Sequence, residues 1–191
     1  HANQNLFEVM INLDPQKAIL KLKNFLSNNP SSFLSAHVLA QVYEKNGLPD
    51  EAIKYYKLAI RAKCDHCPSY NNLGLIYSNK EQFGKAVQVF KNGLQMCLLS
   101  DKNLPGRMNF YKNAGRLFSL AKQFNYAKLC FEKALQIDPA CENSLAQKIF
   151  IEQLTCNWSE IEKYSAYIKD IGISTVAIEP FSMLFLEDDP E

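Results

Sequence analysis

Apolar and small residues recur along the chain at helical spacing, and the recurrence has a longer period of its own. An alanine is followed four residues later by a large apolar residue and seven residues later by another small or apolar one. The four matches are Ala18/Leu22/Phe25, Ala52/Tyr56/Ala59, Ala86/Phe90/Gly93 and Ala127/Phe131/Ala134. Successive alanines are 34, 34 and 41 residues apart. Since residues at such spacings share one helix face, the pattern predicts a helical repeat of about 34 residues.

A second set of positions repeats upstream of each alanine. Its members are Leu39-Ala40 with Tyr43, Leu73-Gly74 with Tyr77, and Ala114-Gly115 with Phe118. We therefore expect two antiparallel helices per unit, A and B, with the small residues where the backbones approach most closely. One such pair cannot bury its apolar face alone, so successive pairs should stack into a solenoid with a concave and a convex side. The predicted fold class is all-α.

These residues resemble the tetratricopeptide repeat, whose 34-residue pattern places Leu-Gly, Tyr, Ala, Phe, Ala and Pro in this order. The resemblance implies a right-handed superhelix of antiparallel helix pairs. We expect the array over residues 1–141, with units at about 1–32, 33–66, 67–107 and 108–141. The third unit contains a seven-residue insertion, DKNLPGR at 101–107. We expect it to lengthen each flanking helix by about one turn, with Pro105-Gly106 at the new turn.

The pattern changes after Pro139. Residues 142–154, ENSLAQKIFIEQL, have the spacing of another A helix. Ser159 followed three residues later by Glu162 is a capping box, which predicts a helix over about 160–170. We expect 142–171 to form an atypical pair of capping helices that closes the end of the solenoid, and 172–191 to be a linker.

A second resemblance rests on motifs near the end of the chain. These are Cys156-Asn157-Trp158-Ser159, followed by Pro180-Phe181 and Asp188-Asp189-Pro190. Together they are similar to the junction in bacterial relatives of the O-linked N-acetylglucosamine transferases and the plant SPINDLY proteins. In that family a tetratricopeptide array leads into two Rossmann-like lobes that bind a nucleotide sugar. The chain departs at Asn157, where the family usually has Asp. The resemblance implies that 172–191 lead towards a catalytic domain absent from this chain.

The charge of the chain and its lack of nucleotide-binding or catalytic motifs exclude several classes of binding partner and cofactor. The chain has 21 basic and 20 acidic residues, so no basic field favours nucleic acid or an anionic membrane. No apolar run approaches the length of a membrane span, and we expect a cytoplasmic protein. There is no glycine-rich nucleotide motif and no Ser/His/Asp arrangement. We therefore expect no cofactor and no catalytic residue, with a nucleotide sugar bound only through the absent domain.

Six cysteines raise two further questions. A helical chain of this length does not need disulfides, so we expect reduced thiols. CDHC at 64–67 is a C-x-x-C pair with His66 inside it and no second pair at zinc-finger spacing. A turn between helices is the favoured interpretation and a metal site the alternative. We expect no bound metal.

The A helices of such a repeat line its concave groove, so their polar residues are the candidate site. Asn72 and Asn113 share one repeat position, and stacked carboxamides can hydrogen-bond the backbone of an extended peptide. Solvated polar residues with no further role are the alternative. In the glycosyltransferase family an asparagine ladder holds the acceptor polypeptide, and the resemblance assigns that role to these two positions. The neighbouring residues included in the candidate site, which we expect to be exposed, are Asn71, Lys112, Arg116, His37 and Gln41.

Two functions remain. The first is the substrate-recruiting region of a protein glycosyltransferase, with a protein or peptide as the partner. The second is a stand-alone scaffold or co-chaperone-type adaptor. A clamp for acidic tails would need Lys and Asn across successive A helices, whereas Lys112 and Arg116 are confined to one unit.

Overall fold

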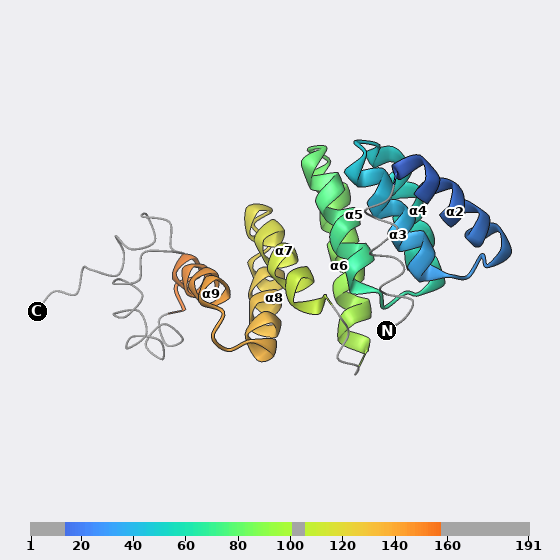
Figure 1. The fold of residues 1–191 in the computed structure, drawn as a ribbon. Coiled ribbons are helices and arrows are strands. Elements are labelled where there is room, and N and C mark those ends of the chain that lie inside the picture. Colours follow the sequence, from blue (N-terminus) through green and yellow to red (C-terminus); the bar gives the residue numbers. More distant parts are fainter. Residues whose placement is uncertain (1–13, 101–105, 158–191) are drawn as a thin grey trace, which may run out of the picture. The chain divides into compact units, whose positions relative to one another are not determined.

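The computed structural model describes residues 14–100 and 106–157 (Figure 1). Within these ranges the chain forms eight α-helices and no strand, so the all-α prediction is confirmed. The helices are α2 (Pro15–Asn28), α3 (Phe33–Lys45), α4 (Pro49–Ala62), α5 (Cys67–Asn79), α6 (Phe83–Leu99), α7 (Arg107–Leu120), α8 (Phe124–Ile137) and α9 (Glu142–Leu154). None of these helices is long and apolar enough to cross a bilayer.

Helices of types A and B alternate along the chain. The A helices are α3, α5, α7 and α9, and the B helices are α2, α4, α6 and α8. Contacts join α2 to α3, α3 to α4, α4 to α5, α5 to α6, and α8 to α9, as Figure 1 shows for neighbouring helices. The chain divides into two compact units between Phe110 and Tyr111, inside α7. We call them the first unit and the second unit, and describe each by itself.

Local sequence explains where several helices begin. The Asp14 carboxylate accepts a hydrogen bond from the backbone N–H of Gln16 at 3.1 Å, directly before α2. The Ser32 hydroxyl accepts one from the backbone N–H of Ser35 at 3.4 Å, directly before α3. Pro49 opens α4, where its missing N–H costs no helical hydrogen bond. These groups satisfy or remove donors that a helix start leaves unpaired.

The repeat alanines form the centre of each helix pair. All four have no exposed surface: Ala18, Ala52, Ala86 and Ala127. The large side chains four residues later, one turn along the same helix face, are also almost fully buried: Leu22, Tyr56, Phe90 and Phe131. The period found in the sequence therefore marks the buried face of the B helices.

The glycines of the second pattern lie where helices approach too closely for a side chain. A Cβ atom placed on Gly115 would lie 2.8 Å from the Phe131 ring, so α7 could not pack on α8 in the same way. Gly74 meets the Phe90 ring in the same manner between α5 and α6. The predicted role of the small residues is confirmed at both positions.

The insertion lengthens one of its two flanking helices. Helix α6 has 17 residues, whereas α4 and α8 have 14. Helix α7 has 14 residues against 13 in α3 and α5, so the predicted extra turn is present in α6 and wrong for α7. Gly106, with φ 76°, directly precedes α7, and this left-handed backbone does not continue an α-helix. Pro105 lies outside the described residues.

The helix expected at 142–154 is α9, Glu142–Leu154. The residues predicted to complete the capping pair and the linker, including Trp158, Ser159 and Glu162, lie outside the described ranges. The capping role of 142–171 and the linker at 172–191 stay predictions.

Candidate functional site

The structure places the predicted site residues on three A helices. His37 and Gln41 lie on α3, Asn71 and Asn72 on α5, and Lys112, Asn113 and Arg116 on α7. The expectation that all of them are exposed is wrong for two: His37 is 7% exposed and Asn71 is 9% exposed. The His37 ring packs between Tyr56 and His66, with centroid distances of 5.4 and 4.8 Å. Of the others, Arg116 is exposed and the rest are half-buried.

Asn72 belongs to a chain of hydrogen bonds in the first unit. Its Nδ2 group donates to the Tyr56 hydroxyl oxygen at 3.0 Å, and the Tyr56 hydroxyl donates to Glu44 Oε2 at 2.6 Å. Asn71 Nδ2 donates to Asn72 Oδ1 at 3.0 Å. The donors all point one way, towards the Glu44 carboxylate. The Asn72 carboxamide is therefore held in one orientation by both of its neighbours.

Burial keeps the Tyr56 hydroxyl protonated, so that it remains a hydrogen-bond donor. The Tyr56 side chain has no exposed surface, and burial raises its pKa far above the usual range. The hydrogen bond to the Glu44 carboxylate raises the pKa further, because the carboxylate stabilises the protonated phenol. Tyr56 therefore stays neutral at any physiological pH and keeps its proton directed at Glu44.

Two histidines share one serine beside this chain of hydrogen bonds. His37 Nδ1 and His66 Nδ1 lie 2.9 and 2.7 Å from the Ser69 hydroxyl oxygen. Burial, and then the charge of His66, together lower the pKa of His37 to about 3. The pKa of His66 falls to about 4, first through burial and then through the charge of Lys63. Both rings are neutral at pH 7, and at least one carries its proton on Nδ1, because a hydroxyl has a single proton to donate.

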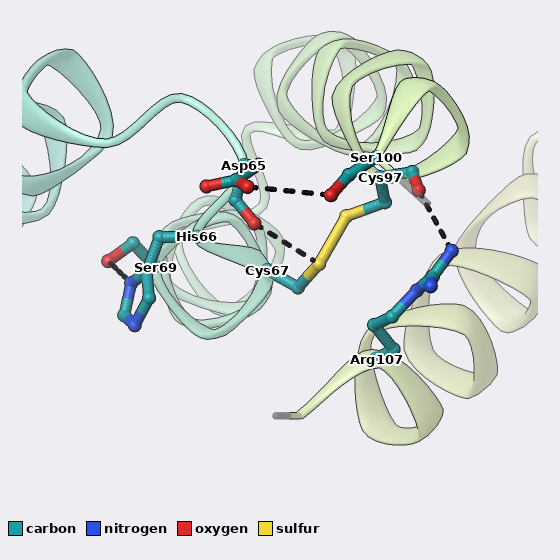
Figure 2. The surroundings of a disulfide bond; sticks show 7 residues. All are labelled: Asp65, His66, Cys67, Ser69, Cys97, Ser100 and Arg107. Carbon is teal, nitrogen blue, oxygen red and sulfur yellow. Dashed lines mark hydrogen bonds between the residues drawn. A yellow bond between two sulfur atoms is a disulfide. The ribbon is translucent and has the colours of Figure 1, made fainter. Parts of the chain in front are cut away.

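A disulfide joins helices α5 and α6, as Figure 2 shows. It links Cys67, at the start of α5, to Cys97, in the last turn of α6, across a Cα separation of 6.6 Å. Arg107 Nη2 donates to the Cys97 carbonyl at 2.8 Å (Figure 2). The expectation of six reduced thiols is therefore wrong for this pair, since both residues lie at the same end of an antiparallel hairpin. The Cys67 sulfur is bonded to Cys97 and does not form a chelating pair with Cys64.

The second unit holds a buried carboxylate. The Glu152 side chain is 1% exposed and pairs with Lys128 Nζ at 2.5 Å. Asn157 Nδ2 donates to Glu152 Oε2 at 2.8 Å. These residues line a hollow of 360 Å³ whose walls also include Phe124 and Ile151. The Glu152 carboxylate is paired with a cation through Oε1, and Asn157 supplies to Oε2 the additional hydrogen bond that a buried carboxylate needs.

Sequence reasoning missed Tyr56, Ser69 and the disulfide. Tyr56 is the one tyrosine at a repeat position that Leu or Phe fills elsewhere, and a buried hydroxyl needs a partner. Cys67 and Cys97 are 30 residues apart in a repeat of about 34, which places them at the same end of a helix pair. No comparable signal marks Ser69.

A model of the tetratricopeptide repeat family matches residues 35–65, 68–97 and 109–141. The expected first repeat, 1–32, is not among the matched segments, and within it the structure describes α2 as the single helix. The three matched segments lie within residues 33–66, 67–107 and 108–141; the exact bounds of the units stay predictions.

Similar proteins support the same fold. The protein ycf37 of Guillardia theta is 26% identical over 125 residues, covering 65% of this chain and 68% of its own length. The structure of PilF from Pseudomonas aeruginosa aligns with a TM-score of 0.63 and 19% identity, over 96% of this chain and 82% of PilF. YrrB, described as a tetratricopeptide-repeat protein with an unusual peptide-binding site, aligns with a TM-score of 0.61 and 14% identity, over 76% of this chain and 71% of YrrB. The chain is therefore a helical-repeat protein that contains three tetratricopeptide repeats, at residues 35–65, 68–97 and 109–141.

Proposed function

We propose that the chain is a protein-interaction module that binds a polypeptide along the polar faces of its A helices. The observation that carries the proposal is the fixed carboxamide of Asn72. A carboxamide has two N–H groups, and the hydrogen bond to Tyr56 uses one of them. The second remains for the backbone carbonyl of a bound peptide. A carboxamide already held in place loses little conformational entropy on binding.

The other predicted residues take different parts in this proposal. Gln41, Lys112, Asn113 and Arg116 retain access to solvent and are proposed to contact the polypeptide. His37 and Asn71 are buried, so we propose that they act by holding their neighbours in place. The peptide-binding site described for YrrB supports this function by analogy of fold.

Selection from a random peptide library tests the proposal. Affinities of the selected peptides are then measured by fluorescence anisotropy for the wild type and for Asn72→Ala. The substitution should weaken binding about tenfold, the effect of losing one hydrogen bond of about 1.4 kcal/mol. Asn92→Ala is the matched control, since Asn92 is an exposed asparagine on the B helix α6. Equal affinities for the two variants would contradict a role for Asn72.

We further propose that this module is the substrate-recruiting part of a protein glycosyltransferase similar to the O-linked N-acetylglucosamine transferases and SPINDLY proteins. The support is the motif at 156–159 together with the Pro180 to Pro190 segment. Of these residues, the structure describes Cys156 and Asn157. No comparison above links the chain to a glycosyltransferase, so the relationship rests on these motifs.

The coding sequence past Glu191 decides this finer proposal. Two lobes of alternating strands and helices should follow, and a stop codon directly after Glu191 would rule the proposal out. Calorimetry with a nucleotide sugar should give no binding heat for residues 1–191, because the donor site belongs to those lobes. Stoichiometric heat would show that the predicted domain boundary is wrong.

The second candidate function is a stand-alone scaffold or co-chaperone-type adaptor without enzymatic activity. The PilF alignment favours it, because an array of this size accounts for 82% of that chain. In either case we propose a cytoplasmic protein whose partners are proteins or peptides.

A further inference from the structure

We infer that Glu44 and Asn72 form one subsite of the peptide-binding face, and that this subsite takes an arginine or lysine side chain of the bound polypeptide. The inference rests on the proposed function and adds to it the chemical class of the partner. It concerns the first unit alone.

The two side chains are held together by a single buried atom. The Tyr56 hydroxyl oxygen lies 2.6 Å from Glu44 Oε2 and 3.0 Å from Asn72 Nδ2. Glu44 and Asn72 come from the successive A helices α3 and α5, and both are half-buried, so solvent or a ligand reaches each of them. The subsite therefore offers a carboxylate and a carboxamide side by side on a rigid base.

The Glu44 carboxylate has no cationic partner among the described residues. The four ion pairs found there are Lys54–Glu51, Lys80–Asp50, Lys128–Glu152 and Lys148–Glu132. The nearest base in the sequence is Lys45, but adjacent helical residues do not face each other. Helix α5 carries no Asp, Glu, Lys or Arg. His37 packs on Tyr56 but is neutral above about pH 4, because burial lowers its pKa to about 3.

The direction of the hydrogen bonds favours a basic partner over an acidic one. Asn71 donates to Asn72, Asn72 to Tyr56, and Tyr56 to Glu44, so the negative charge stands at the end of the chain. A carboxylate that is half-buried and unpaired gains most from a charge-assisted hydrogen bond, and an arginine supplies up to two. The neighbouring carboxamide then meets the peptide backbone. An acidic side chain at the same place would be repelled.

The test uses peptide libraries that differ at one position. Each library is random except for one central residue, which is fixed as Arg, Lys, Ala or Glu. We expect the wild type to bind the Arg and Lys libraries about tenfold more tightly than the Ala library, since one charge-assisted hydrogen bond contributes at least that much. The preference should weaken in high salt, because salt screens the pair. The Glu library should bind weakest.

Two variants assign the preference to Glu44. Glu44→Gln keeps an oxygen that accepts from the Tyr56 hydroxyl, so the fold should survive, as circular dichroism and the melting temperature check. It should abolish the Arg preference, so that the variant binds the Arg and Ala libraries with about the same affinity. Glu51→Gln is the matched control, because Glu51 lies on α4 and pairs with Lys54 at 3.8 Å. Tyr56→Phe should reduce the preference without removing the charge, which identifies Tyr56 as a positioning residue.

The outcomes separate the inference from the proposed function. A preference for Arg that persists in Glu44→Gln would overturn the inference while peptide binding stands. Equal binding of the Arg, Ala and Glu libraries by the wild type would overturn it as well. Binding of no library by the wild type would remove the proposed function and the inference together.

Discussion

Tyr56 occupies the repeat position that Leu22, Phe90 and Phe131 fill elsewhere, and its hydroxyl group gives the first unit its polar network. The hydroxyl joins a residue on α3 to one on α5. The sequence predicted Asn72 as a site residue from its position in the repeat. It did not predict the partners of Asn72, because a hydrogen bond between neighbouring repeats leaves no trace in the period.

The neutral histidines predict a loss of stability in acid. The pKa of His37 is about 3 in the folded protein and about 6.5 in the unfolded chain, so the unfolded chain binds the proton more readily. The stability that His37 contributes is complete above pH 6.5 and is lost as the pH falls from there towards 3. Between pH 7 and pH 5 the loss should be about 2 kcal/mol. His66 changes stability in the same direction.

Urea unfolding at a series of pH values measures this effect. His37→Asn is the informative variant, because its carboxamide can still reach the Ser69 hydroxyl but does not titrate. The free energy of unfolding of this variant should fall less than that of the wild type between pH 7 and pH 5. Parallel curves for the two proteins would show that His37 is protonated in the folded state.

At the scale of helices, the insertion and the disulfide are connected, because the added turn of α6 carries one of the two cysteines. Helix α6 ends three residues later than a helix of the length of α4 would, and those residues are Cys97, Leu98 and Leu99. The added turn therefore carries the cysteine that reaches Cys67. The sequence predicts the added turn but not the disulfide, because chain length, unlike the positions of helix ends, does not indicate which cysteines lie close together.

Cys97→Ala should lower the free energy of unfolding by about 3 kcal/mol under oxidising conditions, since the disulfide closes a loop of about 30 residues in the unfolded chain. In the presence of dithiothreitol the wild type and the variant should differ much less. Alkylation of the denatured wild type without reductant should label four cysteines, namely Cys64, Cys130, Cys141 and Cys156. Labelling of all six would contradict the disulfide.

Two glycine substitutions test the close approach of α7 and α8. Gly115→Ala should destabilise the protein by about 1–3 kcal/mol, because the added Cβ would lie 2.8 Å from the Phe131 ring. Gly84→Ala is the control, since nothing lies within 4 Å of its Cβ position in α6. Alanine is the better helix former, so this variant should be unchanged or up to about 1 kcal/mol more stable. Thermal unfolding compares the two, and equal effects would contradict the packing argument.

At the scale of the whole chain, the repeat period predicted the fold class and most of the buried face of the B helices, with Phe25 of α2, which is 48% exposed, as the exception. It could do so because small and aromatic residues at fixed spacing are what stacked helix pairs require. The period says less about a polar site, since a side chain such as His37 is buried or exposed according to what the next helix places against it. Contacts made by irregular parts of the chain are the least predictable.

Asn157, which follows α9, makes a contact of this kind with Glu152. The glycosyltransferase family usually has Asp where this chain has Asn157. In the structure its carboxamide donates to the buried Glu152 carboxylate, and an Asp there would place a second negative charge beside it. The carboxamide at this position therefore suits the buried Glu152 carboxylate.

The disulfide also ties the stability of this protein to where the protein is found. In an oxidising compartment the bond between Cys67 and Cys97 persists, whereas glutathione and thioredoxin in the cytosol would keep the two residues as thiols. The cytoplasmic location predicted from the sequence and the closed disulfide thus describe two different forms of the same chain. A cell that moved the protein between compartments would change the rigidity of the α5–α6 helix pair without altering a residue.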